Sequence, residues 1–91
     1  MTAADVIFIR DTFKLSQRDL AKSLNIAPYT VARWESGISE PAGLQAEVLR
    51  ALFNTATEIS QRQDTARAQT VGGLIALGIG ALIFYLLSSK R

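Results

Sequence analysis

The stretch LSQRDLAKSLNIAPYTVARWESGISEP, residues 15–41, decides the fold of this chain. Near its start, Ser16 and Asp19 stand three residues apart. This is the spacing of a capping box, in which the two side chains satisfy free backbone N–H groups at the start of a helix. The pattern predicts a helix that begins at Ser16 and runs to about Leu24.

A second helix is predicted directly after a tight turn. Asn25 suits the turn, because its side chain tolerates left-handed backbone. Pro28 suits the first position of a helix, where the missing N–H costs nothing. Gly37 suits the position just past the end of that helix. Residues 28–36 are therefore predicted to be helical.

The predicted helix over residues 28–36 has two different faces. At about 100° per residue, its polar and apolar side chains fall on opposite sides. The polar face carries Tyr29, Arg33 and Ser36. The apolar face carries Val31, Trp34 and Ile38. We expect the apolar group to face a core and the polar group to face outward, with Thr30 on the flank.

Further helices are predicted on both sides of this pair. Thr2 and Asp5 form another capping box, which predicts a helix over residues 2–13. A proline marks the start of a helix over residues 41–53. Because no part of this region alternates with period two for long, strands are not expected. The sequence therefore predicts an all-α domain of four helices over residues 1–54.

A long C-terminal helix is expected to follow the four-helix domain. Thr55 and Glu58 repeat the capping-box spacing and predict a helix that begins near Ala56. Residues 55–69 contain no Gly or Pro and many helix formers. We expect a helical connector that continues into the apolar segment beyond it, with a solvated and partly frayed linker as the alternative.

Residues 15–41 strongly resemble the helix-turn-helix of the phage-repressor and Cro family, also called the XRE family. The family pattern has Ser-Gln opening one helix, then Leu-Ala, a short turn, a recognition helix ending in Arg-Trp-Glu-x-Gly, and a later Pro. Each element is present here at the expected spacing. The resemblance extends to about residue 54 and implies a lambda-repressor-like fold that binds double-stranded DNA. It does not cover residues 56–91.

The resemblance also implies which side chains meet DNA. An early Gln of the first motif helix touches the DNA, and the start and outer face of the recognition helix read the major groove. The implied DNA-binding residues are Gln17, Arg18, Pro28, Tyr29, Thr30 and Arg33. Arg33 is the candidate for a bidentate bond to a guanine edge or for a grip on a phosphate.

A structural ion pair is implied as well. Arg10 and Glu35 stand where the family pairs its first helix with the recognition helix, through a partly buried bidentate contact. One departure concerns Ala27, because the family often has Ser or Thr capping the recognition helix. The absence of a capping hydroxyl at Ala27 costs about 1 kcal/mol of helix stability, and Pro28 partly offsets this cost. Residues 41–52 also look like the variant found in antitoxin-type regulators of the same family.

Charge is divided unevenly along the chain. Residues 1–70 hold eight bases and eight acids, so the net charge of +2 comes from Lys90 and Arg91. The four-helix domain over residues 1–54, called the head below, has no net charge. It therefore neutralises few phosphates and is expected to bind DNA weakly as a monomer. We therefore expect a homodimer that places two heads on paired half-sites.

Several classes of function are excluded by composition. The chain has no Cys and no His, which excludes disulfides, thiolate or imidazole metal sites, and catalysis by Cys-His or Ser-His groups. It also lacks a glycine-rich phosphate loop after a strand and a matched pair of carboxylates. We expect no enzyme, no metal and no cofactor.

The C-terminal segment has a different composition from the head. Between Arg67 and Lys90 lie 22 residues without charge, and residues 71–87 are all hydrophobic or glycine. A helix over residues 70–89 would be about 30 Å long, which matches the hydrocarbon core of a bilayer. This predicts a transmembrane helix in the inner or plasma membrane, with the head in the cytoplasm. Its small-residue stripe, suited to helix–helix packing, is Gly72, Ala76 and Gly80.

Two functions are compatible with this organisation. The first is a membrane-tethered, dimeric transcriptional regulator that represses its target by occupying an operator. The second is a soluble antitoxin-type or phage-type autoregulator, whose hydrophobic C-terminal helix mediates oligomerisation or binds a partner protein such as a toxin.

Overall fold

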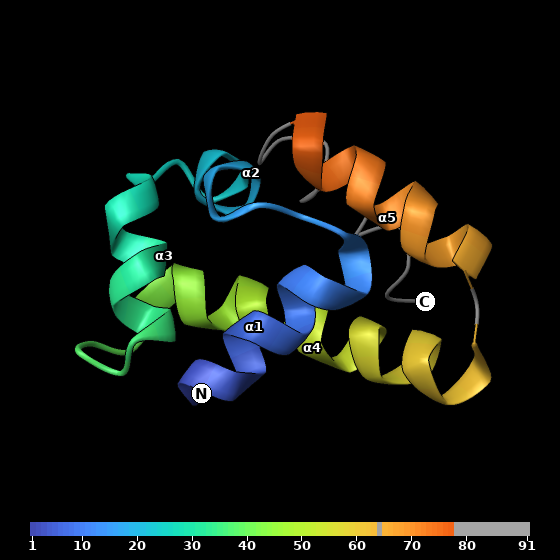
Figure 1. Ribbon diagram of the computed structural model, residues 1–91, viewed down its shortest axis with the longest axis horizontal. Coiled ribbons are helices and arrows are strands. Elements are labelled where there is room, and N and C mark those ends of the chain that lie inside the picture. Colours follow the sequence, from blue (N-terminus) through green and yellow to red (C-terminus); the bar gives the residue numbers. More distant parts are fainter. Residues whose placement is uncertain (64, 78–91) are drawn as a thin grey trace.

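The computed structural model describes residues 1–63 and 65–77, and this part of the chain forms helices and no strand (Figure 1). The helices in chain order are α1 (Ala3–Phe13), α2 (Gln17–Ser23), α3 (Pro28–Glu35), α4 (Gly43–Arg62) and α5 (Thr65–Leu77). The predicted all-α class is confirmed for these residues. The predicted count of four helices in the domain is not confirmed, and neither is the single long helix expected to follow them.

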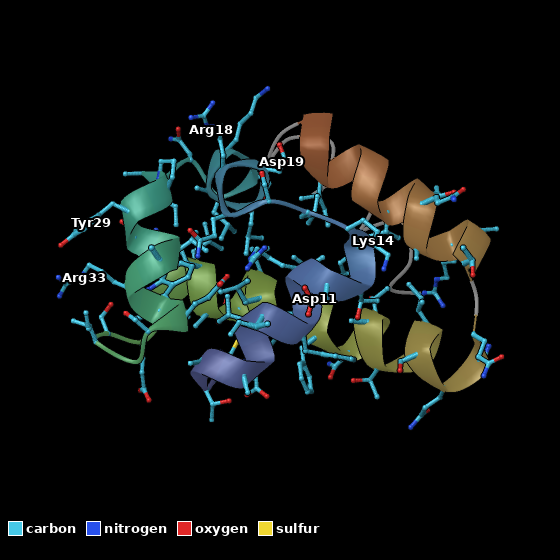
Figure 2. All side chains as sticks on the ribbon, viewed as in Figure 1. Asp11, Lys14, Arg18, Asp19, Tyr29 and Arg33 are labelled. Atoms are coloured by element: carbon cyan, nitrogen blue, oxygen red, sulfur yellow. The ribbon has the colours of Figure 1, made fainter. Side chains whose placement is uncertain are left out.

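The first two helices begin where the sequence predicts. The Thr2 hydroxyl accepts a hydrogen bond from the Asp5 N–H at 3.2 Å, and the Asp5 carboxylate accepts one from the Thr2 N–H at 2.9 Å. Ser16 and Asp19 form the same reciprocal capping box before α2. Lys14, labelled in Figure 2, ends α1 in left-handed backbone with φ 58°.

The third helix also lies where it is predicted, with one error about its apolar face. Val31 and Trp34 are buried as expected. Ile38 is not, since 65% of it is exposed. The helix ends at Glu35, and Gly37 turns the chain with φ 79°. Helical spacing therefore no longer applies beyond Gly37, and the prediction of a core position for Ile38 is wrong.

The fourth helix continues well past Phe53, where it is predicted to end. The separate helix predicted to begin near Ala56 does not exist. Thr55 does not cap a new helix; its hydroxyl donates to the backbone oxygen of Ala51, one turn earlier in α4, at 3.2 Å. The predicted domain end at residue 54 thus falls within α4.

A break at Gln63 separates α4 from α5. Gln63 adopts left-handed backbone with φ 53°, which ends α4. The chain then turns back, and α5 runs across the molecule toward α2 (Figure 1). The continuous helix expected from residue 56 into the apolar segment is therefore wrong. Its predicted part beyond Leu77 lies outside the described residues.

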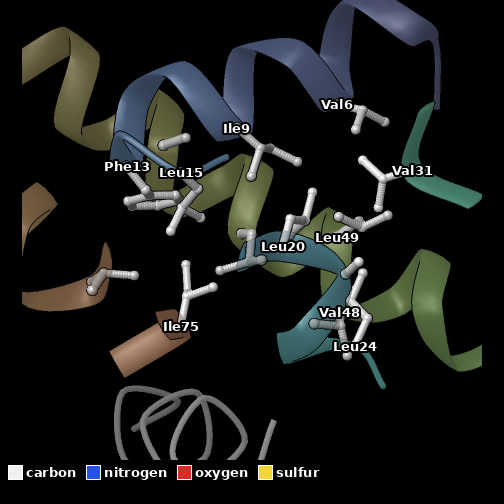
Figure 3. Packing of buried hydrophobic residues seen from close by; sticks show 14 of the residues in the cluster. Val6, Ile9, Phe13, Leu15, Leu20, Leu24, Val31, Val48, Leu49 and Ile75 are labelled. Atoms are coloured by element: carbon white, nitrogen blue, oxygen red, sulfur yellow. The ribbon is translucent and has the colours of Figure 1, made fainter. Parts of the chain in front are cut away.

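The fifth helix adds buried residues to the core. Ala68, Val71 and Ile75 belong to the same hydrophobic cluster as the head, and both Val71 and Ile75 are 0% exposed. Figure 3 shows Ile75 within this cluster, together with Leu15 and Leu20. Val71 and Ile75 of the segment predicted to span a membrane are therefore part of the core, because α1 and α2 present an apolar face that α5 covers.

Two neighbouring glycines in α5 have different surroundings. A Cβ atom added to Gly72 would lie 2.6 Å from the backbone oxygen of Phe13, whereas one added to Gly73 would meet nothing within 4 Å. Gly72 therefore allows a close approach to α1 of its own chain. Of the other two members of the predicted stripe, Ala76 lies in α5 and Gly80 lies outside the described residues.

The predicted transmembrane segment, residues 70–89, is described only in its first part. Residues 70–77 form the end of α5. Within residues 1–63 and 65–77, no helix has the length and hydropathy needed to cross a bilayer. Residues 78–89 lie outside the described part of the chain.

Candidate nucleic-acid interface

One face of α3 is packed in the core and the other faces solvent. Val31 is 0% and Trp34 3% exposed, whereas Tyr29 is 68% exposed. Thr30 and Arg33 are half-buried. Figure 2 shows Tyr29 and Arg33 projecting outward from the same side of α3, at one end of the molecule. The core thus fixes the helix while leaving this side free to meet a partner.

The start of α3 is stabilised by the restricted backbone of a proline and not by a side-chain cap. Ala27 stands at the capping position and makes no side-chain hydrogen bond. Pro28, which is exposed, occupies the first helical position, where its fixed φ suits a helix. The N-terminus of α3 therefore lies at the surface, and no side chain caps it.

Tyr29 and Arg33 contact each other on the exposed face. Arg33 Nη1 donates a hydrogen bond to the Tyr29 hydroxyl at 3.3 Å. The Arg33 guanidinium carbon lies 5.6 Å from the centre of the Tyr29 ring, within the range of a cation–π interaction. The two residues are one helical turn apart, so the helix itself brings them together.

Two implied contact residues lie at the start of α2. Gln17 is half-buried, and its Nε2 donates to Glu35 Oε1 at 3.1 Å. Part of its hydrogen-bonding capacity is therefore used within the protein. Arg18 is exposed and projects away from the body of the molecule in Figure 2. Arg18 is thus available to an external anion.

Arg10 and Glu35 join α1 to α3. Arg10 Nε and Nη2 donate to the two carboxylate oxygens of Glu35, the second at 2.7 Å. Arg10 Nη1 donates to the backbone oxygen of Leu15 at 3.0 Å. With the bond from Gln17, the Glu35 carboxylate ties together α1, α2 and α3. This fork-to-fork geometry fixes α3 against α1 and α2.

The pair also shifts the pKa values of both groups. Burial alone would raise the pKa of Glu35, but hydrogen bonds from Arg10 and Gln17 and the positive charge of Arg10 outweigh it, so this pKa is lowered. The hydrogen bond to Glu35 and its negative charge raise the pKa of Arg10 against the effect of burial. Both shifts favour the charged forms.

We expect Glu35→Gln to lower the free energy of unfolding by about 1.5–3 kcal/mol at pH 7, because it removes bonds to a charged group. The folded-state pKa of Glu35 lies below its ordinary value of 4.5. The contribution is therefore complete above pH 4.5 and is lost as the pH falls through the lowered pKa. Urea unfolding of both proteins at pH 7 and pH 3 measures this, and the gap should narrow at pH 3.

The control for this substitution is Glu47→Gln. Glu47 is exposed on α4, so its change should alter the free energy of unfolding by no more than about 0.5 kcal/mol at either pH. A gap between wild type and Glu35→Gln that is equally large at pH 3 and pH 7 would contradict the assigned role of the charge.

A hollow of about 560 Å³ lies elsewhere, between the end of α1 and the α4–α5 turn. Its charged lining residues are Asp11, Lys14 and Asp19, labelled in Figure 2. Two of them are exposed and the third is half-buried. No buried side-chain nitrogen or oxygen of the described residues lacks a partner, so nothing in the hollow calls for a polar ligand. No group of acidic side chains in the described ranges could hold a metal ion.

Sequence reasoning missed two contacts of the candidate interface. The bond between Gln17 and Glu35 joins residues 18 positions apart, and no local pattern indicates it. The contact between Tyr29 and Arg33 has a visible signal, since residues four apart on a helix are neighbours. The structure thus gathers Tyr29, Arg33 and Thr30 on α3, and gives Gln17 a partner inside the protein.

Comparison with known proteins gives one match. Residues 8–59 match a family model described as helix-turn-helix. The match covers more than half of the chain, from α1 to near the end of α4, and leaves α5 outside. No curated protein and no solved structure matches the chain.

Proposed function

Because the chain belongs to the helix-turn-helix family and is a DNA-binding regulator of transcription, we propose that it is a sequence-specific repressor that binds its operator as a dimer. In this proposal α3 enters the major groove and presents Thr30 and Arg33 to the base edges, with Tyr29 at the same surface beside Arg33. Gln17 and Arg18, at the start of α2, contact the sugar-phosphate backbone. The observation that carries the proposal is the exposed face of α3, whose opposite face is anchored in the core.

The packing of α3 supports this assignment of roles. Trp34 and Val31 anchor the helix, and the Arg10–Glu35 pair sets its position against α1. A recognition helix must hold its side chains in fixed register with the bases, so a rigidly seated helix suits base reading. We assign Arg10 and Glu35 to this support and not to DNA contact.

A dimer is supported by the charge of the head. Residues 1–55 carry six bases and six acids, and one of those bases, Arg10, is paired with Glu35. One head therefore offers few free cations to phosphates, and non-specific affinity depends on that number. Two linked heads raise the apparent affinity through their effective concentration. Half-sites about 10–10.5 base pairs apart are expected from the geometry of such dimers.

We propose repression because occupancy of the operator is sufficient for it. A dimer bound over a promoter excludes other proteins from the same grooves.

Selection of bound sequences from a random DNA pool with the full chain, followed by a transcription assay on the selected site, tests the proposal. Absence of any enriched sequence would overturn it.

Arg33→Ala is expected to weaken binding to the selected DNA by about 1–3 kcal/mol, because a bidentate bond to a base is lost. Fluorescence anisotropy with labelled selected DNA measures the change. Arg62→Ala is the matched control, because it removes the same charge from the end of α4 opposite α3 (Figure 1). Equal losses in the two variants would mean that Arg33 contributes only general charge.

A further inference from the structure

The contact between Tyr29 and Arg33 occupies the surface that the proposed function assigns to base reading. Arg33 Nη1 donates to the Tyr29 hydroxyl at 3.3 Å, and the guanidinium carbon lies 5.6 Å from the ring centre. Tyr29 is 68% exposed, so the contact lies at the surface and not in the core. The backbone oxygen of Arg33 accepts bonds from the Ser36 hydroxyl at 3.1 Å and from the Ile38 and Ser39 N–H groups at 3.0 and 3.4 Å, so these contacts leave the guanidinium untouched.

This contact leaves one edge of the guanidinium unoccupied. Arginine has five N–H donors in a planar fork, and the bond to Tyr29 uses one of the Nη1 donors. The described residues provide no acceptor for Nε or Nη2 of Arg33. The contact with Tyr29 orients the guanidinium, and the edge formed by Nε and Nη2 remains able to make two parallel hydrogen bonds.

We infer that Tyr29 is a positioning residue that holds the Arg33 guanidinium for a bidentate bond to the O6 and N7 atoms of a guanine. This inference rests on the proposed function and adds the base that the site selects. Tyr29 acts here through Arg33, and its hydroxyl is the group that sets the direction of the fork. The half-site is accordingly expected to contain a guanine that the protein requires.

Guanine is assigned in preference to a phosphate because of the place of Arg33 on α3. A phosphate also accepts an arginine fork through two parallel hydrogen bonds. The outer face of α3, however, is the face that the proposed function turns toward the floor of the major groove, where guanine presents O6 and N7. An arginine that is already held by a neighbouring ring has its orientation set before it meets the DNA. Fixing a side chain in its bound conformation improves recognition mainly by reducing the entropy lost on binding.

Tyr29→Phe isolates the hydroxyl, because it keeps the ring and removes only the acceptor for Arg33. Since Tyr29 is exposed, this substitution leaves the core intact. The companion variants are Tyr29→Ala, which also removes the ring, Arg33→Ala, and the double variant Tyr29→Phe with Arg33→Ala. Circular dichroism and the unfolding midpoint of each variant establish that it folds like the wild type.

The experiment uses the full chain and the DNA that it selects from a random pool. Each guanine of the half-site is replaced in turn by adenine and by 7-deazaguanine, which lacks the N7 acceptor. The wild type is expected to discriminate about 5- to 150-fold at one guanine, the range for a bidentate contact. Arg33→Ala should abolish this discrimination. Tyr29→Phe should reduce it several-fold while leaving affinity for unrelated DNA unchanged, and should have no further effect in the Arg33→Ala background.

Three results would overturn the inference. Full guanine discrimination by Tyr29→Phe would show that Arg33 needs no positioning. An equal loss of affinity for all DNA sequences in Tyr29→Phe and Arg33→Ala would show that the pair grips a phosphate. A wild type that selects a sequence without an essential guanine would remove the assigned base. Each of these differs from failure of the proposed function, in which the wild type would enrich no sequence.

Discussion

Trp34→Ala is expected to lower the free energy of unfolding by about 3–5 kcal/mol, the usual cost of removing a buried aromatic side chain. Trp34 is 3% exposed and belongs to the main hydrophobic cluster. The whole stability of a small domain is about 5–15 kcal/mol, so this substitution removes a large share of it. DNA binding should fall with it, because the recognition helix loses its anchor.

The measurement needs a probe other than tryptophan fluorescence, since Trp34 is the single tryptophan of the chain. Urea unfolding followed by circular dichroism at 222 nm is suitable. The neighbouring Arg33→Ala is the control, because Arg33 extends from the outer face and its loss should cost no more than about 0.5 kcal/mol. An unfolding midpoint of Trp34→Ala equal to that of the wild type would place this side chain outside the core.

Ile75→Ala is expected to lower the free energy of unfolding by about 2–5 kcal/mol. Ile75 is 0% exposed and packs in the same cluster as Leu20 of α2. This prediction separates two descriptions of the C-terminal segment. If α5 belongs to the head, removing this side chain leaves a cavity there. If the segment were a separate tail, the same change would leave the stability of the head unaltered.

Thr70→Ala provides the control within the same helix. Thr70 is exposed, and its hydroxyl donates only to the backbone oxygen of Ala66 at 3.1 Å. Its replacement should change the free energy of unfolding by no more than about 0.5 kcal/mol. The two variants together therefore report on burial in α5 and not on helix formation. Equal effects of the two substitutions would contradict the packing described above.

The helix-turn-helix could be predicted because its signals are local. Ser16 with Asp19 begins α2, Pro28 begins α3, and Gly37 follows its end; each acts through hydrogen bonds or backbone conformation within a few residues. The outer face of α3 could be predicted for the same reason, because helical periodicity places Tyr29 opposite the core. These features need no information about the rest of the chain.

The end of α4 could not be predicted, because the same local pattern has two meanings. Threonine and glutamate three residues apart favour a helix start, but Thr55 also satisfies its hydroxyl within a helix by donating to Ala51. Packing decides between the two, since Ala56 and Ile59 of the continued helix are buried in the core. The helix therefore continues to Gln63.

Whether the apolar segment packs against the protein or enters a bilayer depends on residues that lie far from it in the sequence. Val71 and Ile75 would leave water equally well in a bilayer or against a protein surface, since both environments are apolar. Composition alone cannot distinguish these environments. The face that covers them in the described residues comes from α1 and α2, which lie about 50 residues earlier in the chain. The contact between Gln17 and Glu35 was unpredictable for the same reason.

Gly72 lies in an apolar stretch of the kind found in membrane helices, yet its close contact is with Phe13 of the same chain. Position 72 has no side chain, so no Cβ separates α5 from the last carbonyl of α1, and the two backbones are in contact there. Membrane helices use small residues for the same purpose, because backbones can approach only where no Cβ stands between them. A glycine of this kind therefore indicates that another backbone lies close to it. It does not indicate whether water or lipid surrounds the two helices.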